Sequence, residues 1–265
     1  MKTGITWSLS LLLLLMLSLL MACSPAETGE LAFRANGEDF VRQGFVSKDG
    51  WEITFDHVYV NLSDITAYQT DPPYDAHSAA PIESKTRAAL PGVHLVDLAE
   101  GGADAEPLFI GAAADAPAGQ FNALSWRMAP AADGAAAGST LVMVGTAVAG
   151  SQTIPFTISI PTSYEYWCGD YVGDGRKGIL AANSTTDLEL TFHFDHIFGD
   201  AATPADDDLN LGAPGFAPFA AVASGGQLNA TLSDLQAQMD PAAYQALVDI
   251  LPSLGHVGEG HCHSQ

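Results

Sequence analysis

Basic residues are scarce in this sequence. Only 9 Lys and Arg stand against 31 Asp and Glu, which gives a formal net charge of −22 at pH 7. Proteins bind nucleic acid and anionic lipid surfaces through Lys and Arg, so this composition argues against either as a direct partner. The excess of carboxylates favours bound cations instead. A generically acidic surface that keeps an exported protein soluble is the alternative explanation.

Familiar catalytic motifs are also lacking. The sequence contains no Gly-x-Ser-x-Gly nucleophile elbow, no His-Glu-x-x-His helix and no phosphate-binding loop. Nothing in it places a nucleophile beside a base. An enzyme is therefore not the favoured interpretation, and a metal-dependent hydrolase would be its most natural form.

Cysteine is equally rare, with three residues at Cys23, Cys168 and Cys262. If Cys23 is modified as argued below, the other two form a single pair. In an oxidising compartment such a pair predicts a disulfide between Cys168 and Cys262. Joint ligation of a metal ion and two free thiols are the alternatives.

The N-terminal segment is typical of a processed export signal. Lys2 precedes an apolar run over residues 9–20 that is too short to span a membrane. The sequence Leu20-Met21-Ala22-Cys23 resembles the lipobox of bacterial lipoprotein signal peptides. The resemblance implies a signal peptide over residues 1–22, diacylglycerol on Cys23 and a tether over residues 23–30. An ordinary secretory peptide with a chance cysteine is the alternative.

The residue after the expected lipidation site bears on location. Position two of the mature chain is Ser24 rather than Asp, which resembles lipoproteins directed to the outer membrane. Two or three acyl chains anchor a protein firmly. We therefore expect a protein of the bacterial cell envelope, lipid-anchored to the outer membrane on its periplasmic or surface face.

Short apolar runs separated by turn residues predict a single mainly β domain over residues 31–265. We expect an antiparallel β-sandwich with a small helical segment before a His/Cys-rich tail. The expected strands cover residues 31–34, 51–68, 93–98, 121–128, 140–149, 153–160 and 186–198, with loops over 69–89 and 112–119. Ser233 begins a short helix, and Asp240 followed by Pro241 marks the start of another.

The first long strand changes its pattern in the middle. Residues up to Phe55 alternate in one parity, whereas Val58 and its successors follow the other. A β-bulge at Asp56 and His57 would produce this shift and re-aim a side chain. A strand buried on both faces is the alternative.

The tripeptide Phe-Asp-His occurs twice, and its second copy ends the last long strand. His193 and Asp195 are two residues apart, so on a strand they share one face. His196 would join them if the strand bends or bulges there. Exposed residues at a strand end, with His196 in the turn, are the alternative.

The tail supplies further imidazoles. His261 and His263 flank Cys262, and a disulfide to Cys168 would hold them near the sheet. His57, from the first Phe-Asp-His copy, would meet His196 if the two copies lie on neighbouring strands. Loose metal scavenging by a mobile tail is the alternative.

Imidazole and carboxylate ligands, without a cluster of methionines, favour Zn(II) or Cu(II) over Cu(I). The long strand, the Pro/Gly loop, Ala-Pro-Ala-Gly-Gln-Phe at 116–121 and the later His-bearing strand resemble the periplasmic β-sandwich copper-binding lipoproteins associated with methanobactin. That resemblance implies fold and compartment, and it carries over no site residue.

We therefore expect a lipid-anchored extracytoplasmic protein that binds Zn(II) or Cu(II) in metal handling or delivery. The alternative is a non-catalytic surface or periplasmic module that binds a protein or glycan. Its aromatic contacts would come from Trp51, Trp126, Tyr164, Tyr166 and Trp167. For the same residues, ordinary packing in a sandwich core is the simpler explanation.

Overall fold

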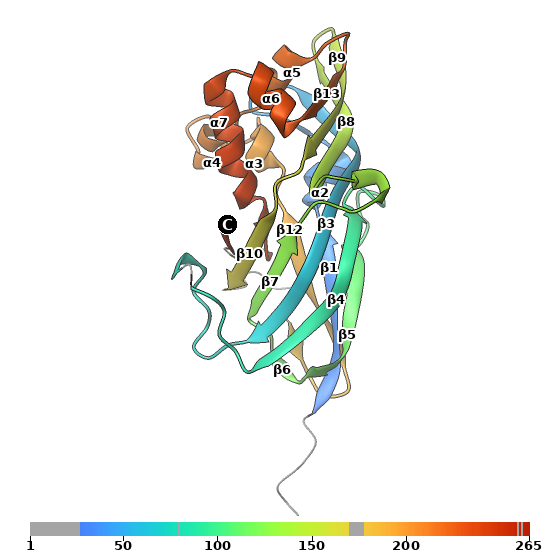
Figure 1. The fold of residues 1–265 in the computed structure, drawn as a ribbon, viewed down its shortest axis with the longest axis vertical. Helices are drawn as coiled ribbons and strands as arrows, with labels where there is room; N and C mark the ends of the chain where they lie inside the picture. The colour runs from blue at the N-terminus through green and yellow to red at the C-terminus, as the bar shows by residue number, and fades with distance from the viewer. Residues whose placement is uncertain (1–26, 79, 170–177, 259, 261) are drawn as a thin grey trace, which may run out of the picture.

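A computed structural model describes residues 27–265 except 79, 170–177, 259 and 261. The molecule is elongated, with strands along its whole length and most of the helices gathered at one end (Figure 1). The predicted signal peptide, the lipidation site Cys23 and the tail residue His261 lie outside the described residues. No described helix has the length and apolar composition that would let it cross a membrane.

The larger sheet is built around the long strand β3. Its path is β13 (Leu228–Thr231), β9 (Gln152–Ile160), β8 (Leu141–Ala149), β3 (Glu52–Gln69), β7 (Ala123–Met128), β10 (Tyr164–Gly169) and β15 (Cys262–Ser264). Two further strands pair with β3, namely β2 (Phe45–Val46) and β4 (Thr86–Asp97). All pairings in this sheet are antiparallel except that of β9 with β13.

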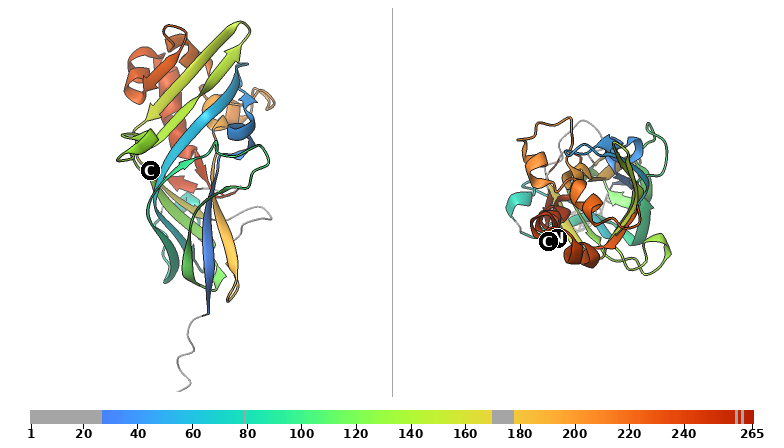
Figure 2. Two further views of the ribbon diagram at one scale, coloured as in Figure 1. Left: turned by 90° about the vertical axis from the view of Figure 1, so that its right-hand side faces the viewer. Right: turned by 90° about the horizontal axis from the view of Figure 1, so that it is seen from above.

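A second sheet faces the first (Figure 2). Its order is β14 (Gly255–His256), β12 (Thr185–Phe192), β1 (Thr28–Asn36) and β5 (Leu108–Pro117). β1 and β12 run parallel, and the other pairs are antiparallel. A two-stranded piece, β6 (Gly119–Gln120) with β11 (Ile179–Leu180), lies beside it. The prediction of a mainly β, sandwich-like fold is confirmed.

The core lies between the two sheets. Leu31 and Phe33 of β1 are fully buried, as are Val58, Val60 and Leu62 of β3, and all belong to one continuous apolar cluster. Their every-second-residue spacing points them to one face of each strand. Burial of each large apolar side chain contributes about 1.5–3 kcal/mol, which is why the alternation fixes the strand faces.

The helices are short. They are α2 (Glu38–Gln43), α3 (Asp195–Phe198), α4 (Asp208–Gly212), α5 (Ala217–Val222), α6 (Leu232–Gln238) and α7 (Pro241–Ile250), with one-turn helices η1 (Ala76–Ser78), η2 (Gly134–Ala136) and η3 (Leu251–Ser253). Of these, α3 to α7 gather at one end of the sandwich (Figure 1). The two predicted C-terminal helices are confirmed. Asp240 accepts hydrogen bonds from the backbone of Ala242 and Ala243, and Thr231 forms a capping box with Asp234.

The predicted β-bulge in β3 is confirmed. The pairing of β3 with β8 shifts register between Phe55 and His57. Phe55 therefore points to the packed side, where it meets Phe194 and Phe198 at ring-centroid distances of 6.1 and 6.3 Å. His57 is re-aimed outward, with its side chain about half exposed.

Several predicted boundaries are wrong. The segment 112–119, expected to be a loop, falls mostly within β5, because backbone pairing with β1 holds residues too small to show a strand pattern. The expected loop 69–89 ends early, since β4 already begins at Thr86. β1 begins at Thr28, so three residues of the expected tether belong to the sheet.

The predicted disulfide joins Cys168 of β10 to Cys262 of β15. The two residues are directly opposite each other in the β10–β15 pairing. The C-terminal tail is therefore covalently fixed to the larger sheet.

Candidate metal centre

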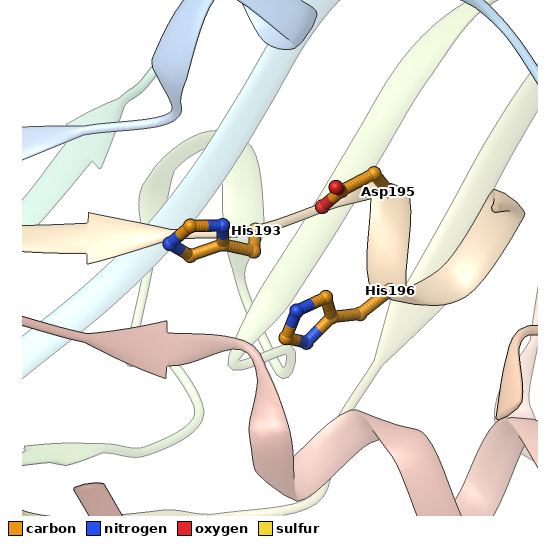
Figure 3. A group of neighbouring side chains, drawn as sticks. All are labelled: His193, Asp195 and His196. Atoms are coloured by element: carbon orange, nitrogen blue, oxygen red, sulfur yellow. The ribbon is translucent and has the colours of Figure 1, made fainter. Parts of the chain in front are cut away.

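His193, Asp195 and His196 come together where β12 ends. The strand stops at Phe192, and the backbone N–H of His193 donates to the carbonyl of Leu254. Each of the three side chains then offers one ligand atom, and these atoms lie within 4.8 Å of one another. Figure 3 shows the Asp195 carboxylate and the His196 ring both directed toward His193.

The prediction of one strand over residues 186–198 is wrong in its last part. Asp195 begins the single helical turn α3. Phe194, Ile197 and Phe198 are all buried, and their spacing of three and four residues suits a helical face as well as a strand end. Because of this turn, His196 lies on the same side as His193, where a straight strand would have separated them.

A third imidazole, His256, completes a cluster of three rings. Strand β14 places His256 opposite Thr191 of β12. The ring centroid of His256 lies 4.4 Å from that of His193 and 5.3 Å from that of His196, and the His193 and His196 centroids are 5.3 Å apart. The tail therefore reaches the centre through its first histidine.

One nitrogen of each ring lies beside a carboxylate or carbonyl oxygen, which can only accept a hydrogen bond. His193 Nδ1 lies 3.3 Å from the Glu38 carboxylate. His196 Nδ1 and His256 Nε2 lie 3.1 and 3.0 Å from the carbonyl oxygen of Ser253. These nitrogens therefore donate, and in the neutral form of a ring the other nitrogen keeps its lone pair. That is the form in which histidine binds a metal ion while an outer acceptor orients it.

Glu38 reaches this centre from a neighbouring strand. β1 runs beside β12 with Asn36 opposite Thr191, and the chain turns directly after Asn36 into α2. The Asn36 side chain accepts a hydrogen bond from the Glu38 backbone N–H at 3.0 Å. Glu38 itself has a φ of 57°, a left-handed conformation uncommon outside glycine and asparagine.

Burial keeps the His193 and His196 rings neutral. It lowers the pKa of His193 to about 3, with smaller contributions from the neighbouring His256 and His196. Burial likewise lowers the pKa of His196. At neutral pH an incoming metal ion would therefore meet rings that carry no proton on the ligating nitrogen.

Two buried polar atoms in the centre lack a hydrogen bond within the described part of the chain. They are Nε2 of His193 and Oδ1 of Asp195. Burial also raises the pKa of the Asp195 carboxyl. Buried polar atoms of native proteins are almost always paired, with protein, water or an ion. Two such atoms in one group of potential ligands make this centre the candidate site for a further partner, whether water or an ion.

Two other predicted ligands, His57 and His263, lie elsewhere. His57 Nδ1 donates to the Asp97 carboxylate at 2.7 Å and the ring stacks on Tyr59, so His57 is not part of the group. His263 stacks on Trp167 with ring centroids 5.9 Å apart. The two Phe-Asp-His copies do meet, through Phe55 and Phe194, but their histidines point to different surroundings.

Sequence reasoning did not assign His256 and Glu38 to the centre. His256 belongs to the His-rich tail, which is the signal that could have identified it. Glu38 carries no local signal, since its position depends on the parallel pairing of β1 with β12.

Comparison with protein-family models, with characterised proteins and with solved structures finds no match to this chain. Its function must therefore be inferred from the centre itself.

Proposed function

We propose that this protein binds Zn(II) or Cu(II) at the centre formed by His193, Asp195, His196 and His256, and that it serves metal handling or delivery outside the cytoplasm. The observation that carries the proposal is the pair of buried, unpaired ligand atoms, His193 Nε2 and Asp195 Oδ1, within a cluster of three imidazoles.

The donor set fits these ions. Imidazole and carboxylate ligands suit Zn(II) and Cu(II), whereas Cu(I) favours thiolate and thioether. Zinc ligands lie about 2.0–2.2 Å from the ion, so two of them are at most about 4.4 Å apart. The ligand atoms of His193, Asp195 and His196 lie within 4.8 Å of one another, so these three need only a small side-chain movement to reach that geometry.

The surroundings supply the outer partners that metal-ligating histidines use. Glu38 and the carbonyl of Ser253 accept hydrogen bonds from the ring nitrogens that would not face the ion. A cation would also offset the partial burial of the Asp195 carboxylate. The proposed lipid anchor at Cys23 would keep this centre beside a bacterial membrane.

Metal titration of the untagged chain, produced without its predicted signal peptide, tests the proposal. We expect one equivalent of Zn(II) or Cu(II) to bind and to raise the melting temperature, because an ion that binds only the folded state stabilises it. The double variant His193→Ala/His196→Ala should lose this uptake, and His256→Ala should weaken it by more than about tenfold.

The double variant His57→Ala/His263→Ala is the matched control, since it removes two imidazoles that lie outside the centre. It should bind as the unchanged protein does. Equal uptake by the His193/His196 variant and the unchanged protein would contradict the proposal.

A further inference from the structure

A second candidate site lies on the outer face of the larger sheet. β10 runs between β7 and β15, so Trp167 is directly opposite Ser125 on one side and His263 on the other. Residues directly opposite in an antiparallel pair point to the same face. Trp126 and Tyr166, which alternate with them, are 2% and 1% exposed in the core. The row containing Trp167 therefore faces away from the core.

Trp167 differs in this respect from the other aromatic residues that the sequence offered as contacts. Trp51, Trp126, Tyr164 and Tyr166 are all buried core residues. The Trp167 ring is only partly covered. It packs at the rim of a small outer cluster formed with Tyr74 and Ala76, where the segment containing η1 folds over the sheet.

The Trp167 side chain lines a hollow of about 200 Å³, and its ring stacks on that of His263. Ser125 and Arg127 of β7, Glu165 of β10 and Asp64 of β3 also line the hollow, which the core residues Trp126 and Tyr166 border as well. The hollow thus combines an aromatic wall with polar groups at its edge.

Two charged side chains of the hollow form an ion pair and remain partly exposed. Arg127 Nε lies 3.7 Å from a Glu165 carboxylate oxygen, and both side chains are nearly half exposed. Asp64 sits at a register shift of β3 and has a φ of 55°. Its side chain is exposed and lines the hollow at the point where the ladder of β3 with β4 is interrupted.

The chemistry of these groups selects one class of ligand. Arg127 disfavours a cation, and two carboxylates disfavour an anion. A sugar ring has an apolar C–H face that lies flat on an indole and hydroxyls at its rim that both donate and accept. Donors and acceptors placed around an aromatic wall are the arrangement that orients such a ligand.

We propose that the hollow bounded by Trp167, Arg127, Glu165 and Asp64 binds a neutral sugar ring, separately from the metal centre. Trp167 provides the stacking surface. Arg127 and the two carboxylates hydrogen-bond the ring hydroxyls.

Saturation-transfer NMR on the full mature chain tests this proposal, with glucose, galactose, mannose and N-acetylglucosamine as probes at millimolar concentrations. At least one probe should bind saturably and alter tryptophan fluorescence, because Trp51 and Trp126 are shielded in the core. Chelator should leave sugar binding unchanged, which separates this result from the fate of the metal proposal.

Two variants and a control localise the binding. Trp167→Ala should abolish the transfer signal, and Arg127→Ala, which leaves the outer cluster intact, should weaken binding about tenfold, the equivalent of one lost hydrogen bond to a charged group. Arg87→Ala removes the same charge from an exposed position of β4 and should have no effect. No response to any probe, or equal binding by Arg127→Ala and Arg87→Ala, would overturn the proposal.

Discussion

Glu38 is the residue on which the orientation of the His193 ring depends most directly. Its carboxylate is the acceptor at His193 Nδ1, and its backbone is held by Asn36 at the end of β1. A carboxylate in this position fixes the tautomer of the ring and makes its other nitrogen a better ligand. Glu38 is thus a positioning residue in the proposed centre.

We expect Glu38→Gln to lower the affinity for Zn(II) or Cu(II) by about 10–100-fold, the usual effect of removing an outer-shell carboxylate. Isothermal titration measures the change. Glu52→Gln, an exposed change at the start of β3, should leave the affinity as it was. An affinity for Glu38→Gln equal to that of Glu52→Gln would rule out this role.

Sequence reasoning found part of the centre because part of it is local. His193, Asp195 and His196 lie within four residues, so any compact turn brings them together. Glu38 and His256 arrive by pairing of β1 and β14 with β12, over large separations in the chain. Pairing between such distant strands depends on the complete set of strand contacts, so the residues beside Glu38 and His256 in the sequence give no signal of it.

At the scale of elements, α3 is a single turn whose stability comes from its tertiary contacts. Phe198 is fully buried, and its ring meets those of Phe45, Phe55, Phe216 and Phe219 at centroid distances of 5.7–6.3 Å. A helix of four residues is too short to be stable alone. The aromatic cluster therefore holds in place the turn that carries Asp195 and His196.

Phe198→Ala should lower the free energy of unfolding by about 3–5 kcal/mol, because it removes a buried aromatic ring and leaves a cavity. Chemical denaturation monitored by circular dichroism measures this loss. Phe109→Ala, at a ring that is 62% exposed on β5, should change stability by less than about 0.5 kcal/mol. Similar losses for the two variants would contradict the role given to the cluster.

Strand β10 carries two tyrosines whose ionisation is resisted by the fold. Burial raises the pKa of Tyr164 to about 12 and also raises that of Tyr166 above its usual value of 10. A pKa raised in the folded state means that stability is intact below pH 10 and falls as the pH rises toward 12. The loss is about 1 kcal/mol per pH unit for each tyrosine.

An alkaline titration followed by phenolate absorbance and circular dichroism checks this expectation. Phenolate from these two residues should appear together with loss of structure. Tyr164→Phe should shift the alkaline transition to higher pH. Ionisation of all tyrosines near pH 10 in an intact fold would show that β10 is far more accessible than its burial indicates.

The elements best predicted from sequence are those whose pattern is set by burial. The parity change at Phe55 and Val58 located the bulge, and Asp240 with Pro241 located the start of α7. β5 was missed because Ala112 to Ala118 shows no alternation of large and polar side chains. Its place depends on backbone pairing with β1. Small residues permit this pairing but produce no recognisable strand pattern in the sequence.

For the whole molecule, the disulfide is the feature that closes the chain on itself. Cys168 and Cys262 are 94 residues apart, and the link holds the short strand β15 in register with β10. A covalent loop of this size removes entropy from the unfolded chain, which stabilises the fold by about 2–5 kcal/mol.

Cys168→Ser/Cys262→Ser should therefore lower the free energy of unfolding by about 2–5 kcal/mol. Reduction of the unchanged protein with a phosphine should have the same effect, and it serves as the control for the substitutions themselves. Denaturation curves of the three samples give the comparison. A stability unchanged by both treatments would show that the strand pairing alone secures the tail.

The long axis of the molecule has two unlike ends (Figure 1). β1 begins at the end formed by strand tips alone, whereas α5, α6 and α7 cap the opposite end. The proposed lipid on Cys23, only a few residues ahead of β1, would hold the end formed by the strand tips at the bilayer. The end capped by α5, α6 and α7 would then lie farthest from the bilayer, where it would be the most accessible part for an approaching molecule.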